Sequence, residues 1–304
     1  YRHDWPKHAV ARQLDSGMPL VRFRWWRYVW VILTQIPRYG NDRAETKRPR
    51  TERSHEDAPS SEPADDASGT VAAVREEDEP RREPDDEKPA AAGEIYLVID
   101  DVGNSLALLD EFLALDIPMT YAVMPGRTYT EESLRRVIDA GHPAILHQPM
   151  EPLGDADPGP GALFASMGKG EIRAILTENI DSMPGIAGLN NHMGSRVTSD
   201  PVAMDHVMEF LSERELFFFD SVTTDRSVAE DAAARHGVQY ARRTELFLDN
   251  DGDYDAILSK LELGITHAAG AGRVILIGHV TTPELVRVLA DQSAVLRKQG
   301  YTFR

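Results

Sequence analysis

The sequence predicts an α/β fold with about seven parallel strands, and its alternation of apolar runs and amphipathic stretches carries this prediction. From Glu94 onward the two kinds of segment follow one another regularly, a pattern that predicts a parallel sheet, either open and doubly wound or closed into a barrel. Seven or eight such units in roughly 210 residues favour a small (β/α) barrel. With 304 residues, 41% of them hydrophobic, the chain can build one large domain or two small ones.

Short apolar runs bounded by polar segments are the predicted strands. They are Ile95–Ile99, Met119–Met124, Ala144–Gln148, Ala187–Asn190, Leu216–Phe219, Leu246–Leu248 and Val274–Ile277. The stretches between them are longer and amphipathic, which indicates helices. These are Ser105–Leu115, Thr130–Ala140, Glu171–Met183, Asp200–Glu215, Ser227–His236, Tyr254–Ala269 and Pro283–Gln299. Gly141 and Gly237 stand where a helix-ending glycine is expected.

The first 93 residues differ from the rest in composition. Residues 38–93 lack apolar periodicity and are rich in Pro, Asp, Glu, Arg and Ser, so we predict a disordered charged linker. Within residues 1–37, three arginines precede an apolar stretch, Tyr28–Ile36, that is shorter than the roughly 20 residues of a spanning helix but long enough for a signal peptide. Residues 1–37 are therefore either an export signal or anchor, which would tether the domain outside the inner membrane, or unstructured. The barrel domain is residues 94–304.

Charge and cysteine content exclude several classes of function. The chain has no cysteine, which excludes disulfides, thiolate zinc sites and cysteine nucleophiles. The net charge is −17 and lies mostly in residues 94–304. An acidic domain argues against a nucleic-acid partner, because binding a duplex needs clustered cations. Any metal ion must be bound by His, Asp or Glu.

Polar side chains collect where the predicted strands end, the edge at which (β/α) folds place their chemistry. They are Asp100, Asp101, His147, Glu151, Asn190, Asn191, His192, Ser195, Arg196, Asp220, Ser221 and His279. Adjacent carboxylates repel each other and resist burial, so a bound cation would explain the Asp100–Asp101 pair. One Asp and two His from separate strands form an open set of ligands for a divalent metal, and the other Asp would be free for proton transfer.

Each of these residues also has an ordinary structural explanation. An Asp pair after a strand is often a helix cap beside a surface acid, and a single His can be a buried imidazole with its hydrogen bonds satisfied. Their coincidence at one edge favours a functional site. The acidic segment Leu246–Asp255 lacks the spacing of a calcium loop and is interpreted as a turn. The absence of a G-x-S-x-G motif argues against a serine hydrolase built on Ser195.

Six segments in order match a known family. IYLVIDDVGNS, YAVMPG, HQPMEP, NNHMGSRVTSD, FFFDSVTT and GHVTTPELVRVL together resemble the divergent polysaccharide deacetylases, a bacterial group related to the NodB-type carbohydrate esterases. The resemblance covers about residues 94 to 304. It implies a distorted (β/α) barrel and often an exported protein.

The resemblance also implies residue roles. Asp100 would be the general base, Asp101, His147 and His192 the metal ligands, and His279 the general acid. Typical members place two metal-binding histidines four residues apart in one motif, whereas this sequence has His147 and Glu151 at that spacing. The second histidine would then come from the next strand.

The implied function is a metal-dependent hydrolase that removes acetyl groups from a bacterial envelope polysaccharide or a related carbohydrate, located in the periplasm or cell envelope. The predicted substrate-binding residues are Glu151, Asn191, Arg196 and Asp220, and Asp220 is also a candidate to orient His279. Ligation by His and Asp suits Zn²⁺ best and leaves Co²⁺, Ni²⁺ and Mn²⁺ open. The alternatives are a hydrolase of some other amide or ester, and a non-catalytic protein for glycan binding or envelope assembly that keeps the barrel.

Overall fold

The structure is a computed structural model that describes residues 92–304 except Leu246. The segment predicted as a signal or anchor, and all but the last residues of the predicted linker, lie outside the described residues. Among the helices of the described residues, none combines the length and apolar character that a membrane span requires.

The described chain alternates strands and helices, as the sequence predicts. The strands are β1 Gly93–Val102, β2 Thr120–Val123, β3 Ala144–Met150, β4 Gly188–Met193, β5 Phe217–Asp220, β6 Tyr240–Arg242, β7 Arg273–His279 and β8 Tyr301–Phe303. The helices are α3 Leu109–Leu113, α4 Thr130–Asp139, α5 Lys169–Asp181, α6 Pro201–Arg214, α7 Ala229–His236, α8 Tyr254–Ala271 and α9 Pro283–Lys298.

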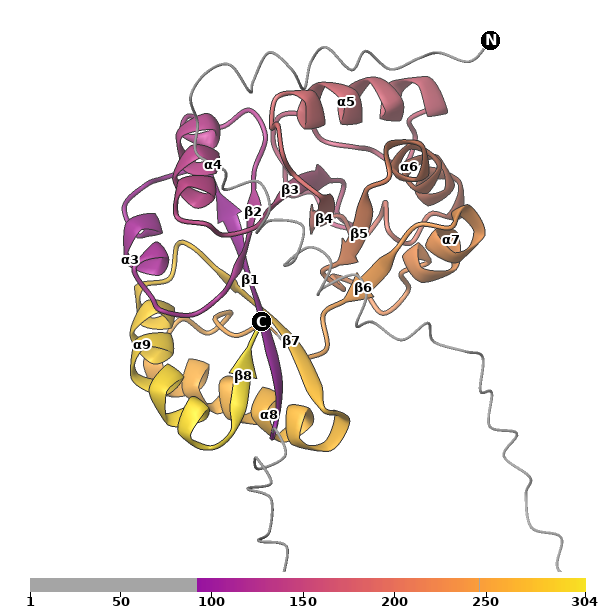
Figure 1. Cartoon of the computed structure of the whole chain (residues 1–304). Helices are drawn as coiled ribbons and strands as arrows, with labels where there is room; N and C mark the ends of the chain where they lie inside the picture. Colours follow the sequence, from indigo (N-terminus) through magenta and orange to yellow (C-terminus); the bar gives the residue numbers. More distant parts are fainter. Residues whose placement is uncertain (1–91, 246) are drawn as a thin grey trace, which may run out of the picture. The chain divides into compact units, whose positions relative to one another are not determined.

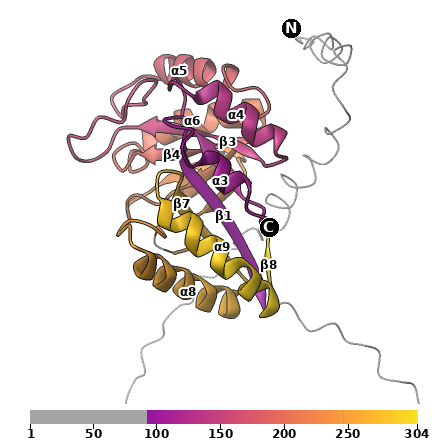
Figure 2. The ribbon, with the colours of Figure 1, turned by 90° about the vertical axis from the view of Figure 1, so that its left-hand side faces the viewer.

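All strand pairs are parallel, in the order β6-β5-β4-β3-β2-β1-β7, with β8 added to β1. Strands β1 to β7 form a nearly closed barrel, and the helices surround it on the outside (Figure 1). Figure 2, turned by 90°, shows α8 and α9 side by side below, where they pack on each other. The predicted barrel of about seven parallel strands is confirmed.

The sixth strand was predicted at the wrong place. It is Tyr240–Arg242, whereas Phe247 and Leu248 are not in a strand. Leu248 is nevertheless fully buried, because its segment runs along β7 and its N–H donates to Ile277 O at 2.9 Å. Its apolar residues therefore reflect burial against β7 rather than strand pairing. The short strand β8 was not predicted.

Local signals explain where the helices begin and end. Helix α6 starts with Pro at its first position, and the Asp200 carboxylate accepts hydrogen bonds from the N–H groups of Val202 and Ala203, at 2.9 Å each. Helix α7 ends at Gly237, whose φ of 67° is accessible to glycine at little cost. The glycine predicted to end this helix is thus confirmed.

Side chains alternate along each strand between two separate cores. On β1, the side chains of Ile95, Leu97 and Ile99 belong to the large core between strands and helices, whereas Val98 belongs to a smaller core inside the barrel. The smaller core is completed by Ala122, Ile145, Phe217, Phe219, Ala241 and Ile277. The inward-facing rows are thus apolar over most of their length, which excludes water from the barrel interior.

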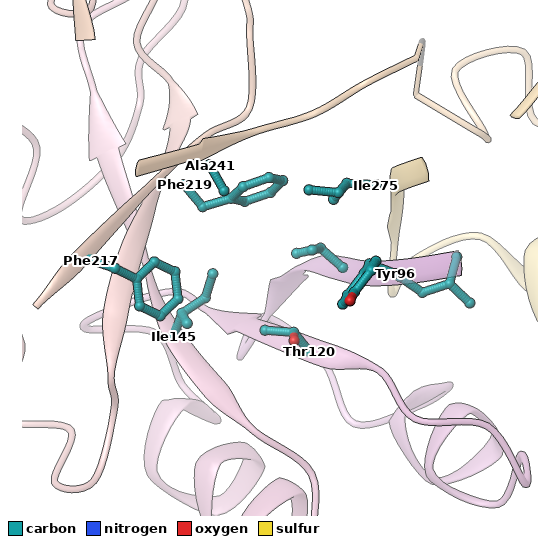
Figure 3. Close-up of a pocket in the computed structure, with 9 residues that line it drawn as sticks. Tyr96, Thr120, Ile145, Phe217, Phe219, Ala241 and Ile275 are labelled. Atoms are coloured by element: carbon teal, nitrogen blue, oxygen red, sulfur yellow. The ribbon is translucent and has the colours of Figure 1, made fainter. Parts of the chain in front are cut away.

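A small apolar hollow remains inside the barrel. Figure 3 shows its wall, with Phe217 and Ile145 at one end and Tyr96 and Ile275 at the other. The ring of Phe217 fits there because its neighbour on β4 is Gly188: a Cβ at Gly188 would lie 2.6 Å from Phe217 Cδ1 and from Phe217 O. The absence of a side chain at Gly188 thus makes room for the aromatic wall.

We predict that Gly188→Ala lowers the free energy of unfolding by about 1–3 kcal/mol, because a fixed backbone oxygen and a ring must both move to admit the methyl group. Gly154→Ala is the matched control, since a Cβ at this exposed position meets no atom within 4 Å. Its unfolding free energy should stay within about 0.5 kcal/mol of wild type. Urea unfolding measures both, and equal stabilities for the two variants would contradict the packing argument.

Candidate metal centre

The inward-facing rows change from apolar to polar at the carboxyl ends of the strands. The side chains that end these rows are Asp100, His147, Asn190, His192, Ser221 and His279. Strand register sets them side by side: Asp100 pairs with His279 across β1 and β7, and His147 pairs with Asn190 across β3 and β4. Residues far apart in the sequence thereby share one small volume.

Asp101 joins this group through a β-bulge. Between Ile99 and Val102 the register of β1 against β2 shifts, so that Asp100 and Asp101 together stand opposite one residue of β2. Asp101 has a φ of 63°, in the left-handed region that residues other than glycine seldom adopt. In a regular strand two successive side chains face opposite sides. Here the bulge turns both carboxylates toward the barrel end, and such local strain is typical of functional sites.

Asp101, His147 and His192 converge. Asp101 Oδ1 lies 3.3 Å from His147 Nε2 and 3.0 Å from His192 Nδ1, and the two ring nitrogens are 3.1 Å apart. The opposite nitrogen of His147, Nδ1, lies 2.8 Å from Asn190 Oδ1. An amide oxygen only accepts hydrogen bonds, so Asn190 places the proton of a neutral His147 on Nδ1 and leaves the Nε2 lone pair facing the other two groups.

These three side chains fit a divalent cation. One ligand atom from each lies within 4.8 Å of the others, and Asp101 Oδ1 is a buried oxygen that no hydrogen bond satisfies. A buried carboxylate oxygen without a donor is costly, and a cation would compensate it. Although burial opposes ionisation, the two imidazoles hold the pKa of Asp101 well below its usual range. The donor set of one carboxylate and two imidazoles is one that transition metals accept.

Asp100 is the second carboxylate and lies deeper. It is 2% exposed, its Oδ1 accepts a hydrogen bond from Asn190 Nδ2 at 2.9 Å, and its Oδ2 is 3.8 Å from His147 Nε2. Burial raises its pKa above the ordinary value, against the attraction of the nearby imidazoles. A carboxylate with a raised pKa accepts a proton more readily than an exposed one.

His279 is held by Asp249, a residue that the sequence analysis did not select. Asp249 Oδ1 lies 2.8 Å from His279 Nδ1, and its Oδ2 accepts a hydrogen bond from the His279 backbone N–H at 2.7 Å. Burial opposes protonation of the ring, but the bond to Asp249 outweighs it and raises the pKa of His279 to about 9. One feature of the sequence could have pointed to Asp249. It directly follows the apolar run Leu246–Leu248, just as Asp100 and Asp220 follow apolar strands.

The family model for divergent polysaccharide deacetylases matches residues 97–304. The chain belongs to this family. The resemblance predicted from the sequence motifs is therefore confirmed. The domain also has relatives by sequence and by fold.

Two comparisons show what the domain is similar to. It is 34% identical to the uncharacterized protein YibQ of Escherichia coli over 201 residues, which are 66% of this chain and 62% of that protein. The chain thus covers less than two thirds of this relative. An uncharacterized protein from Agrobacterium tumefaciens has a crystal structure with a TM-score of 0.64, at 22% identity over 70% of this chain and 87% of that one, which shows a shared fold.

Strand pairing explains how the histidines of this chain come together although they are not four residues apart. His147 and Glu151 are four residues apart, but Glu151 lies beyond the end of β3 and its Oε1 forms an ion pair with Arg196 Nε at 3.1 Å. Pro149 pairs with His192 across β3 and β4, which brings the His192 ring to that of His147. The imidazole that accompanies His147 thus comes from a neighbouring strand and not from the residue four positions on.

The other predicted substrate-binding residues divide into two groups. Glu151 and Arg196 are partly exposed at the rim. Asn191 and Asp220 are each 1% exposed and bond internally: Asn191 Oδ1 accepts from Ser221 N, and Asp220 Oδ2 accepts from Ser227 Oγ at 2.6 Å. The acid in contact with the His279 imidazole is Asp249 rather than Asp220. Substrate contact by all four residues stays a prediction.

We predict that Asn190→Ala weakens Zn²⁺ binding about 10- to 100-fold, because the His147 ring loses the group that fixes its tautomer and orientation. His206→Ala, which removes an imidazole on helix α6, is the control and should bind as wild type does. Competition with a chromophoric chelator measures the affinities. An Asn190→Ala protein with wild-type affinity would contradict the role of this amide.

We predict that the His279 ring in metal-free protein titrates near pH 9, and that Asp249→Asn lowers this midpoint toward the ordinary value of about 6.5. Because folding raises the pKa of His279, protonation of its ring stabilises the folded state. This stabilisation is complete when the pH is below the pKa of the unfolded chain, and it is lost as the pH rises through about 9. Asp249→Asn should therefore cost more unfolding free energy at pH 6 than at pH 10. Histidine NMR titration checks the first statement and urea unfolding checks the second. Equal His279 titration midpoints in wild type and Asp249→Asn would contradict the role of Asp249.

Proposed function

We propose that this domain is a metal-dependent hydrolase that removes acetyl groups from a bacterial envelope polysaccharide or a related carbohydrate. One observation carries the proposal: a buried carboxylate, Asp100, and an imidazole with a raised pKa, His279, occupy paired positions on β1 and β7 beside three metal-ligand side chains. A protein that only binds glycans needs neither a base nor an acid at such positions. Family membership supports a carbohydrate substrate.

Asp101, His147 and His192 would hold the metal ion. A divalent cation bound by such ligands lowers the pKa of water and polarises a carbonyl oxygen. We propose Zn²⁺, because His and Asp ligands suit it. Elemental analysis of the purified protein would identify the bound metal ion.

Two groups of the chain would move protons. Asp100 is positioned to accept the proton of the attacking water, and its buried, Asn190-bonded carboxylate keeps one orientation. His279 is protonated near neutral pH, so it can donate to the leaving nitrogen or oxygen of the sugar. Asp249 holds Nδ1 of that ring, and the donated proton would come from Nε2. The scissile bond breaks as the acetyl carbon takes the hydroxyl of the water and the sugar takes the proton from His279.

The rim offers a surface that suits a sugar. Arg196 Nη2 donates to Leu153 O at 3.2 Å, and the Ala165 N–H donates to Glu151 Oε2 at 2.9 Å, so backbone groups near two exposed apolar residues, Leu153 and Phe164, hold the Glu151–Arg196 pair. Leu153 is 52% exposed and Phe164 is 37% exposed. Charged groups next to apolar side chains match the hydroxyl edge and the C–H faces of a sugar ring. We propose substrate contacts here, and a location in the cell envelope, where such polysaccharides occur.

We predict that Asp100→Asn lowers kcat for acetate release from an acetylated glycan by at least about 100-fold, because the amide cannot accept the proton of water. Bound metal should remain stoichiometric. Glu111→Gln, at an exposed acid of α3, is the control with wild-type rate. Acetate is measured enzymatically over a panel of N- and O-acetylated glycans. Full metal with no acetate release from any glycan by the wild type would favour the binding-protein alternative, and an unchanged Asp100→Asn rate would exclude Asp100 as the base.

A further inference from the structure

The barrel has a seam between β6 and β7. In the described part of the chain no strand pairing joins these two strands. Residues 243–245 and 247–249 follow β6 and attach to β7, where the Thr244 N–H donates to Ile275 O at 3.0 Å and the Leu248 N–H donates to Ile277 O at 2.9 Å. The segment that closes the barrel is therefore also the one that delivers Asp249 to His279.

Arg243 is the central contact of this seam. Its Nε donates to Ser221 O and its Nη2 to Val222 O, each at 2.9 Å, and its Nη1 donates to Glu245 O. Its Cζ lies 4.3 Å from the centre of the Phe247 ring, within the range of a cation–π interaction. The partly buried guanidinium thus holds the loop after β5 and, on its face, one aromatic ring.

Phe247 passes this contact on to the imidazole of His279. The two rings are stacked, with centres 5.4 Å apart and an interplanar angle of 26°. Asp249 fixes the edge of the imidazole at Nδ1, and Phe247 covers a face. Within the described residues Nε2 makes no hydrogen bond, so the ring is held in two directions while the nitrogen that would donate remains available.

The same guanidinium reaches the base through the loop. Val222 has a φ of 51°, a strained value for a β-branched residue, and Arg243 binds its carbonyl. Ser221 Oγ accepts from Asn190 Nδ2 at 3.1 Å, and that amide also donates to Asp100 Oδ1 at 2.9 Å. The Arg243 guanidinium therefore supports two parts of the site. It binds the loop after β5, which contacts Asp100 through Asn190, and it stacks on the Phe247 ring that lies against His279.

We propose that Arg243 and Phe247 are positioning residues that orient His279 for proton donation, with Arg243 stacked on Phe247 and Phe247 stacked on the imidazole. This assignment rests on the proposed hydrolase function for its kinetic consequence, but not for its structural one. Neither side chain needs to touch substrate. Their effect is on kcat through the geometry of the acid rather than on substrate affinity.

The test uses Phe247→Leu, which keeps apolar volume but removes the flat face, and Arg243→Met, which removes the cation. The control is Phe303→Leu. Phe303 is a buried residue of β8, and Arg297 Cζ lies 5.9 Å from the centre of its ring, in a similar cation–π contact. In the 304-residue chain with ¹⁵N-labelled histidine, the His279 Nδ1 proton should give a slowly exchanging signal in wild type and in Phe303→Leu. The signal should broaden or exchange at least 10-fold faster in Phe247→Leu and Arg243→Met.

Kinetics supply the second arm. With a glycan that releases acetate, Phe247→Leu should lower kcat about 10-fold or more with KM and bound metal unchanged, while Phe303→Leu loses stability without loss of kcat. A wild type that releases no acetate defeats the proposed function, but the NMR arm still decides the positioning role. Phe247→Leu with wild-type exchange of the Nδ1 proton overturns the inference, and so does a kcat loss equal to that of Phe303→Leu.

Discussion

The site depends on one geometric constraint, the alternation of side chains along parallel strands that are held in register. Every second residue enters the barrel, so each strand contributes one inward row. On β1, β3 and β7 an apolar residue of the inner core, Val98, Ile145 or Ile277, is followed in the same row by a polar residue, Asp100, His147 or His279. The apolar side chains inside the barrel keep water and competing polar groups away from the inner side of the polar site. The polar part is confined to the carboxyl end, where a low effective dielectric strengthens each electrostatic contact.

The bulge in β1 interrupts that alternation at Asp100 and Asp101. Without it, Asp100 and Asp101 would face opposite sides of the sheet, and one carboxylate would be buried against a helix. The left-handed conformation of Asp101 costs free energy, and in return the two acids lie beside each other with different surroundings. Two imidazoles approach Asp101, whereas an amide and deep burial surround Asp100. Different surroundings push the two pKa values apart, which lets adjacent identical side chains serve different purposes.

Two residues to which the sequence analysis assigned no role, Asn190 and Asp249, hold this arrangement. Asn190 contacts both His147 and Asp100 through opposite ends of its amide, so it orients a ligand candidate and a base candidate at once. Asp249 orients His279 by binding both its Nδ1 and its backbone N–H. Such supporting bonds matter because a metal ligand or acid is useful only in one orientation and protonation state.

The sequence by itself determined the strand and helix alternation, the barrel, the family and the residues that end the inward rows, because these are encoded in local periodicity and motifs. Tertiary structure decided the partnerships. His147 lies against His192, 45 residues away, rather than pairing with Glu151 four residues on, and Asp249 rather than Asp220 reaches His279. Strand register and the path of the segment across the seam set these contacts. Neither leaves a local signal, because each depends on the packing of elements distant in sequence.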